Sequence, residues 1–497
     1  MIDRTAQISV GLLAMVLAAL VSCGPRSGAL GGSDGAASSI PSEAELHAWG
    51  LPGDLAGDTL EHLKVLLIPA RVERVDWLPP SVETLIVRGP EAPVFRELPA
   101  GLKLLDLNQT GIEQLPALPK GLETLDVRHS AIETVEELPK TVTRLAVSGT
   151  QVSGLEGQPC YPTLQGLALE RPDGMPAGRR RDLSYLPLGL RELVLVGPYF
   201  EGLGGLPPTV SVLVLDGTKV KNLAGSEQSV RTLQLLDNFH LKPQELPPLL
   251  EDLVFSPSVN ALPFELAGAV LNGRYLQRLL VRRGEVGDLT QLPPTVVYLG
   301  LPLESTGELL DRWEELRQTN GSMASVSDLR LPLRRADLAR AARLPVSELD
   351  IQEDAEAAEP MSSLRFAELQ GTAGAGLRLP SVRRLSLSSL HSLAEIDGLA
   401  STFPNLEELF VQGTKVETLG TLPPHLRLLD LRGTKVSLLA GLPESLEVLA
   451  IHPDQVSSLG TTLPNLRALF IAGPEEPLIG LSGRWESAFL GLSSQGP

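Results

Sequence analysis

Leucine recurs along this chain at a spacing close to twenty residues, and this repeat limits the possible folds more than any other feature. The clearest copies read LPAGLKLLDLNQTGIEQLPA, LPKGLETLDVRHSAIETVEE and LPKTVTRLAVSGTQVSGLEG, beginning at Leu98, Leu118 and Leu138. Such a period predicts a repeat solenoid, in which each repeat buries its apolar face against its neighbours. The second leucine of the shared pattern L-x-x-L-x-L marks each repeat and occurs at Leu66, Leu85, Leu105, Leu125, Leu145, Leu167, Leu193, Leu213, Leu233, Leu253, Leu279, Leu299, Leu329, Leu349, Leu385, Leu409, Leu429, Leu449 and Leu469.

Each repeat contains a short stretch with the alternation of a β-strand that has one buried face. Leu105 and Leu107 lie on either side of Asp106, so two leucines point one way and the aspartate points the other. Pro99 and Pro119 precede such stretches and cannot sit inside a central strand. The prolines therefore mark the return segments between strands.

The full pattern, L-x-x-L-x-L-x-x-(T/S)-x-(I/V)-x-x-L, resembles the leucine-rich-repeat family. Its short spacing and recurring LPxxL phrase look most like the short bacterial subclass found in secreted effector proteins. The resemblance covers nearly the whole mature chain and implies an α/β-class solenoid, mostly short parallel strands on a concave face. Strands about 4.8 Å apart, one from each repeat, would form an arc about 90 Å long.

Threonine or serine stands where the family prefers asparagine. A small polar side chain is required there because the chain leaves the strand and would otherwise bury unpaired backbone groups. These residues are interpreted as structural, and the glycines that precede several of them are expected to permit the turn. The polar positions are Thr110, Ser130, Thr150, Thr218, Thr414 and Thr434, with Asn238 as an exception, and the glycines are Gly149, Gly217, Gly413 and Gly433.

The residues beside each marker leucine, and the one three beyond it, should face away from the core and pave the concave sheet. Elsewhere this face carries charge, as at Asp106, Asp126, Arg128, Arg144 and Asp430, but in the middle repeats it is apolar. A contiguous apolar stripe on a charged surface is a candidate site for a protein partner. The alternative is that these residues satisfy β-propensity or are covered by inserted loops. The predicted partner-binding residues are Val194, Val196, Val212, Val214, Leu236, Val254, Leu280 and Tyr298.

The amino terminus has the pattern of a secretory signal, with an apolar run from Ile8 to Val21 behind Arg4. Leu20-Val21-Ser22-Cys23 resembles the lipobox of bacterial lipoproteins, which implies cleavage before Cys23 and its acylation. An uncleaved anchor or a simple secretory signal is the alternative. In this resemblance Gly24 after the cysteine favours the outer membrane, and two acyl chains would hold the protein in the envelope.

The expected organisation follows from these patterns. Inserted segments lengthen the spacing near 170–189, 256–275, 302–325 and 352–381, and Gly307 to Gln318 has Leu309, Leu310, Trp313 and Leu316 at helical spacing, which predicts a helix packed on the solenoid. The chain is divided into a signal peptide at 1–22, a flexible tether at 23–40, an N-terminal cap at 41–62, the solenoid at 63–475 and a C-terminal cap or tail at 476–497.

Charge and cysteine usage limit the function. Sixty acidic and 42 basic residues give a formal charge of −18, which disfavours nucleic acid as a partner. Cys160, the second cysteine, falls at an inward repeat position and is interpreted as a small core residue. No phosphate-cradling loop, HExxH helix or CxxC pair occurs, so no catalytic residue, metal or other cofactor is predicted.

The sequence therefore predicts a lipid-anchored envelope protein that binds a protein or peptide on its concave face and has no enzymatic activity. One alternative is an envelope component that binds cell-wall polysaccharide, although the concave face offers few aromatic rings beyond Tyr298, Phe410 and Phe470. The other is a secreted leucine-rich-repeat effector, which acylation of Cys23 would oppose by retaining the chain at the membrane.

Overall fold

The part of the chain that builds the solenoid is described in a computed structural model. It covers residues 63–471 apart from 70–73, 76–77, 90–93, 136–137, 148–149, 151–163, 171–182, 185, 227–228, 237–245, 257–274, 283–288, 320–322, 354–360, 367–368, 370–375, 438, 440, 453–454 and 456–462. Cys23, Cys160 and the two expected caps lie outside these described residues.

Each repeat contributes one strand to a single parallel sheet of 19 strands, and every marker leucine lies in one of them. The predicted fold class is thereby confirmed. The strands are β1 (Val65–Pro69), β3 (Thr84–Arg88), β5 (Leu104–Asp106), β6 (Thr124–Asp126), β7 (Arg144–Ala146), β8 (Gly166–Glu170), β9 (Glu192–Val196), β10 (Val212–Asp216), β11 (Thr232–Leu236), β12 (Asp252–Ser256), β13 (Arg278–Val281), β14 (Tyr298–Gly300), β15 (Asp328–Arg334), β16 (Val346–Gln352), β18 (Arg384–Ser386), β20 (Glu408–Phe410), β21 (Leu428–Asp430), β22 (Val448–Ile451) and β23 (Ala468–Ile471).

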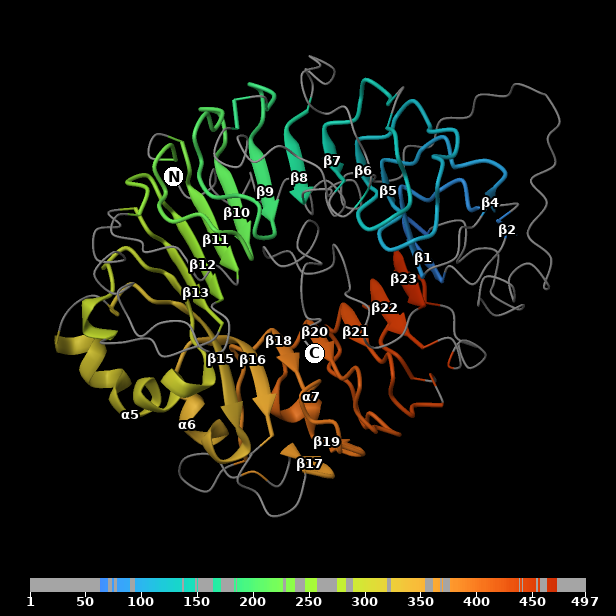
Figure 1. Ribbon diagram of the computed structural model, residues 1–497. Coiled ribbons are helices and arrows are strands. Elements are labelled where there is room, and N and C mark those ends of the chain that lie inside the picture. Colours follow the sequence, from blue (N-terminus) through green and yellow to red (C-terminus); the bar gives the residue numbers. More distant parts are fainter. Residues whose placement is uncertain are drawn as a thin grey trace, which may run out of the picture.

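The solenoid closes into a ring, where the sequence led us to expect an arc (Figure 1). The first strand, β1, pairs with β3 on one side and with the last strand, β23, on the other, where Leu66 lies opposite Leu469. The length of about 90 Å that the strand spacing predicts for the sheet is thus the circumference of the ring, which corresponds to a backbone radius of about 14 Å. Closure leaves this sheet without an edge, and the concave face becomes the wall of a central lumen.

The register around the ring shows how the closure is made. The marker leucines lie opposite one another in neighbouring strands and so form a row. From Leu66 through β3 and the strands that follow, this row reaches Leu329 in β15. From Leu66 in the other direction, through β23, it reaches Leu349 in β16, which is paired with Leu331 of β15. The two paths differ by two residues (331 − 329 = 2), and the pairing is irregular between Leu329 and Arg330. An even offset is required because an odd one would exchange the core and lumen faces of every strand.

The core lies between the sheet and the return segments. It contains the marker leucines and, from the inserted segment, Leu309, Trp313 and Leu316, with Leu310 packed against it. These four belong to helix α5 (Leu303–Thr319), so the predicted helix is confirmed. No helix in the described residues is long and apolar enough to cross a membrane. The shorter helices are η2 (Leu289–Gln291), η3 (Arg335–Asp337), α6 (Leu338–Ala341) and α7 (Leu399–Thr402), and two small sheets pair β2 (Arg74–Val75) with β4 (Val94–Phe95) and β17 (Ser363–Arg365) with β19 (Glu395–Asp397).

The predicted hydroxyl ladder is present in five repeats. Thr110 donates to the Leu107 carbonyl at 2.7 Å, and Thr414 donates to the Val411 carbonyl at 2.7 Å. Left-handed backbone geometry occurs just before the hydroxyl at Gln109, Gly413 and Gly433, with φ angles of 60°, 71° and 67°, and Gly149 lies outside the described residues. Ser130, Thr150 and Thr434 make the same bond to the residue three before them.

A second polar ladder at the opposite end of the strands escaped the sequence analysis. Thr209, in the LPPTV turn before β10, donates to the carbonyls of Leu188 and Leu190 in the preceding repeat at 2.6 and 2.7 Å. These bonds join consecutive repeats, because donor and acceptors lie about one period apart. The same role falls to Thr141, Thr295, Asn405, Ser445 and Asn465.

Candidate functional site

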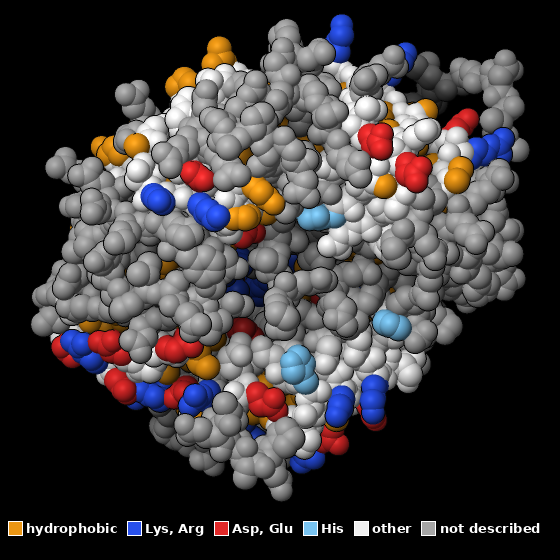
Figure 2. All heavy atoms as spheres, in the orientation of Figure 1, with side chains coloured by type: hydrophobic (Ala, Val, Ile, Leu, Met, Phe, Trp, Pro, Cys, Tyr) orange, Lys and Arg blue, Asp and Glu red, His pale blue; other side chains and the backbone are white. Residues whose placement is uncertain are grey.

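The lumen wall is formed by the side chains that alternate with the core leucines. In β10, Leu213 and Leu215 belong to the core, whereas Val214 belongs to a separate apolar cluster on the lumen side. The predicted orientation of the strands is therefore correct. Figure 2 shows a hollow near the centre of one face of the ring, in which basic and acidic side chains lie.

One side of the lumen carries a continuous cluster, here called the apolar wall, which runs from β7 to β14. Of the eight residues predicted from sequence, six belong to it and Val196 packs against it. Val212 lies elsewhere, in the row nearer the strand amino termini between Glu192 and Thr232. The apolar wall consists of Ala146, Ala168, Val194, Val214, Leu236, Val254, Leu280 and Tyr298.

The apolar wall is shielded from solvent in the closed ring. Val254 is 2% exposed, Val214 is 3% exposed and Tyr298 is 7% exposed. Only Val196 and Val212 among the predicted residues are partly exposed. The residues therefore lie on the face that we predicted, but most of them are not an open surface in this state.

A second apolar cluster, here called the seam patch, lies where the two ends of the sheet meet. It was not predicted, since its members come from both ends of the chain and become neighbours only through ring closure. Val448 packs against its edge. The seam patch consists of Val65, Leu67, Ile86, Ala450, Ala468 and Phe470.

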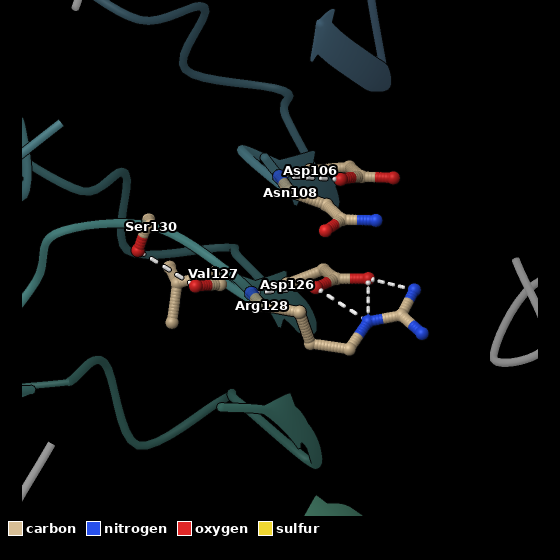
Figure 3. A network of polar contacts seen from close by, with 6 residues as sticks. All are labelled: Asp106, Asn108, Asp126, Val127, Arg128 and Ser130. Carbon is tan, nitrogen blue, oxygen red and sulfur yellow. Dashed lines mark hydrogen bonds and ion pairs between the residues drawn. The ribbon is translucent and has the colours of Figure 1, made fainter. Parts of the chain in front are cut away.

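Between the two apolar regions, β5 and β6 present polar side chains toward the same side (Figure 3). Arg128 donates from Nε to Asp126 Oδ1 at 3.0 Å and from Nη2 to Asp126 Oδ2 at 2.6 Å. Both residues are buried, and burial raises the pKa of the Asp126 carboxyl, while the Arg128 guanidinium opposes that rise. Asp106 accepts a bond from the Asn108 amide nitrogen of the backbone at 2.9 Å.

The same ion pair recurs at the end of β21. Arg432 donates from Nε to Asp430 Oδ1 at 2.9 Å and from Nη2 to Oδ2 at 2.8 Å, and both residues are buried. The sequence carried this signal, because LDVRHS and LDLRGT place aspartate and arginine two apart on one strand face. Each pair satisfies its own charges, so it contributes structure to the wall more than it offers a binding group.

The aromatic rings of the wall have occupied or buried faces. The Arg278 guanidinium lies 4.0 Å from the centre of the Tyr298 ring, whose hydroxyl donates to Glu348 at 3.2 Å. Arg384 lies over Phe410 at 4.4 Å, and Phe470 is fully buried in the seam patch. These rings are therefore poorly placed to stack on sugar rings.

Chemically active groups are few on the described part of the wall. Burial raises the pKa of Asp252 in β12 to about 7, with Arg278 opposing the rise. Its neighbours in the same row are Thr232 and Arg278, which do not form a nucleophile with an activating base. Among the described residues, no group of three or more His, Cys, Asp or Glu side chains is arranged to hold a metal ion.

Comparison with known proteins adds the following. No protein-family model matches the chain, and no curated protein matches it. It is similar in structure to YopM from Yersinia enterocolitica WA-314, with 19% identity over 83% of this chain and 80% of that one and a TM-score of 0.25. It is also similar to the LRR protein LIC12759 of Leptospira interrogans, with 18% identity over 75% of this chain and 84% of that one and a TM-score of 0.25. TLR13 in the TLR13-ssRNA13 complex is similar as well, with 16% identity over 82% of this chain and 66% of that one and a TM-score of 0.34.

The fold is that of a leucine-rich-repeat solenoid. Its decisive feature is one strand per repeat in a parallel sheet whose marker leucines all face one core.

Proposed function

We propose that this protein is a non-catalytic binding scaffold of the bacterial envelope, anchored by lipid at Cys23, whose lumen wall contacts a protein partner. The observation that carries the proposal is the apolar wall over β7 to β14. The solenoid already has a complete core on the other face of the sheet. The apolar wall is thus a second apolar cluster, separate from that core and spread over eight strands, and such clusters serve association where a partner can reach them.

The size of the lumen limits what the partner can be. A backbone radius of about 14 Å, reduced by side chains on all sides, is too small for a folded domain of 100 residues, whose radius of gyration alone is about 13 Å. A single helix is about 10 Å across and an extended strand is narrower. A partner must therefore present a narrow segment or meet the ring in an opened state.

A partner on the wall can be detected by crosslinking in cells. A photoreactive amino acid at Val196 or at Val212 should give the same adduct from both positions, because both residues are partly exposed on the lumen side. The control position is Glu113, which is exposed on a return segment. An adduct from Glu113 alone, or none at all, would contradict a partner on the wall.

Substitution gives an independent test of the same contact. Val212→Asp should abolish the adduct formed from Val196 without unfolding the protein, since Val212 lies outside the buried cluster. Val214→Asp is unsuitable, because it would place a charge at a position only 3% exposed.

The anchor is tested by labelling. We expect a palmitate analogue to be incorporated at Cys23, and we expect Cys23→Ser to release the protein from the membrane fraction. Protease added to intact cells would reveal which side of the membrane the ring faces. Release of unacylated wild-type protein would favour a secreted effector. Binding of purified cell-wall polysaccharide with no protein adduct would favour the carbohydrate alternative, which the covered faces of Tyr298 and Phe410 speak against.

A further inference from the structure

We infer that the junction between β1 and β23, here called the seam, is the gate of the ring, and that its opening admits the partner to the apolar wall. The inference rests on the proposed function for the identity of the site, but the opening itself can be measured without any partner. It explains how side chains that are nearly all buried in the closed ring can contact another protein.

Connectivity makes the seam different from every other junction. Each of the other neighbouring strand pairs is joined by the chain of a single repeat or insertion, whereas the seam pairs Val65 with Ala468, 403 positions apart (468 − 65 = 403). No covalent link crosses it within the described residues. The two ends can therefore separate while all the other junctions of the sheet stay paired.

Charge distinguishes the seam as well. In the row just before the strands, Arg427 pairs with Glu447 at 3.0 Å, and Lys64 and Lys103 both pair with Glu83, at 2.8 and 2.7 Å. Acidic and basic residues alternate along this row from Arg383 through Glu407 to Arg467, and from Lys64 to Glu123. Across the seam the alternation fails, since Lys64 lies beside Arg467 and donates its backbone N–H to the Arg467 carbonyl at 2.9 Å.

Two basic side chains at neighbouring positions of paired strands weaken their junction. The ion pairs of Lys64 and Lys103 converge on Glu83, on the β3 side, so they strengthen the junctions within the amino-terminal repeats. The charged residues just before the strands thus form ion pairs on either side of the seam, whereas at the seam itself two basic residues, Lys64 and Arg467, are neighbours.

Opening at this point would also create binding surface. It would divide the seam patch, exposing Val65 and Leu67 on one edge and Ala468 and Phe470 on the other, and would free two strand edges that can pair with an extended segment. The apolar wall would then lie on the concave side of an open solenoid, which a partner could approach through the opening.

Hydrogen exchange of the purified full-length protein tests the gate alone. The backbone N–H groups of Lys64 and Val65 donate across the seam to Arg467, and those of Glu83 and Thr84 donate in the same way to Lys64 across an ordinary junction. We expect the first pair to exchange at least tenfold faster. Lys64→Gln, which removes one of the like charges, should slow exchange at Val65 about two- to fivefold. Equal exchange in the two pairs, or no response to the substitution, would overturn the gate.

A reversible lock tests its consequence. Lys64→Cys with Arg467→Cys, in a Cys160→Ser background, places two thiols on adjacent strands about 4.8 Å apart at Cα, within the range for a disulfide. The matched control, Lys103→Cys with Glu123→Cys, bridges an ordinary junction of the same row. We expect the oxidised seam lock to remove the crosslinked adduct at Val212, reduction to restore it and the control disulfide to leave it unchanged.

The outcomes separate the two ideas. An adduct that persists in the locked ring would overturn the gate and leave the proposed function standing, with a narrow segment entering a closed lumen. No adduct in the unlocked protein would contradict the proposed function, and the exchange rates at Lys64 and Val65 would then decide the gate by themselves.

Discussion

Asp252 shows how burial changes the chemistry of a single residue. Burial on the lumen wall raises its pKa to about 7, so the fold favours the protonated carboxyl. Its contribution to the free energy of unfolding is therefore largest below about pH 4, where the unfolded chain also becomes protonated, and is lost as the pH rises to about 7.

Asp252→Asn should therefore stabilise the protein at pH 8 and change little at pH 4. Each pKa unit corresponds to about 1.4 kcal/mol, so the gain at pH 8 should reach a few kcal/mol and stay below about 4 kcal/mol. Urea unfolding at the two pH values measures it. Glu113→Gln, an exposed acid made neutral, is the control. A gain of equal size at both pH values would show that Asp252 does not titrate in this window.

The buried pair of Asp126 and Arg128 makes a second residue-scale prediction. Arg128→Met leaves the Asp126 carboxylate in the wall without its bidentate partner, and should lower the free energy of unfolding by about 3–5 kcal/mol. Adding Asp126→Leu should recover part of that loss, because no unpaired charge remains. Denaturant unfolding of both variants measures the coupling, and equal losses would mean that solvent reaches the pair.

At the scale of one repeat, the strand, its register and the hydroxyl after it could all be predicted from sequence. The signal is local there, because apolar periodicity places Leu105 and Leu107 in the core and an unpaired backbone carbonyl requires a residue such as Thr110. The turn ladder of Thr209 was missed because its hydroxyl bonds to the preceding repeat, and spacing alone does not show which carbonyls remain free.

The hydroxyl ladder gives the prediction at this scale. Thr414→Val keeps the shape of the side chain but removes the hydroxyl bond, so that the buried Val411 carbonyl keeps only the bond from the Thr414 backbone N–H at 3.3 Å. The substitution should lower the free energy of unfolding by about 1 kcal/mol. Thermal and urea unfolding measure it. Thr134→Val, at an exposed position, is the matched control and should change stability by less than about 0.5 kcal/mol. Similar effects at the two positions would mean that the ladder contributes little.

At the scale of the whole molecule, the sequence supported the number of strands and the side of the sheet that each residue faces, but not closure. Closure depends on a rotation of about 19° per repeat, summed over all the strands, and a small change in each step would give an open arc or a spiral. The seam patch follows from closure, because its members come from the two ends of the chain. The repeat pattern could place Val194 and Val254 on the correct face, but their burial depends on packing that the pattern does not determine.

Removing the last strand should turn the ring into an open solenoid. A chain ending at Gln455 lacks β23, so β1 loses its partner across the seam, and the buried Leu66 and Ile68 become the uncapped end of the core. We expect small-angle X-ray scattering to show a larger maximum dimension, together with self-association through the free strand edges. A chain ending at Ile471 retains every strand of the sheet and should scatter as the full-length ring does. If the shorter chain keeps the dimensions of the longer one, pairing between β1 and β23 does not hold the ring closed, and the curvature of the repeats alone determines its shape.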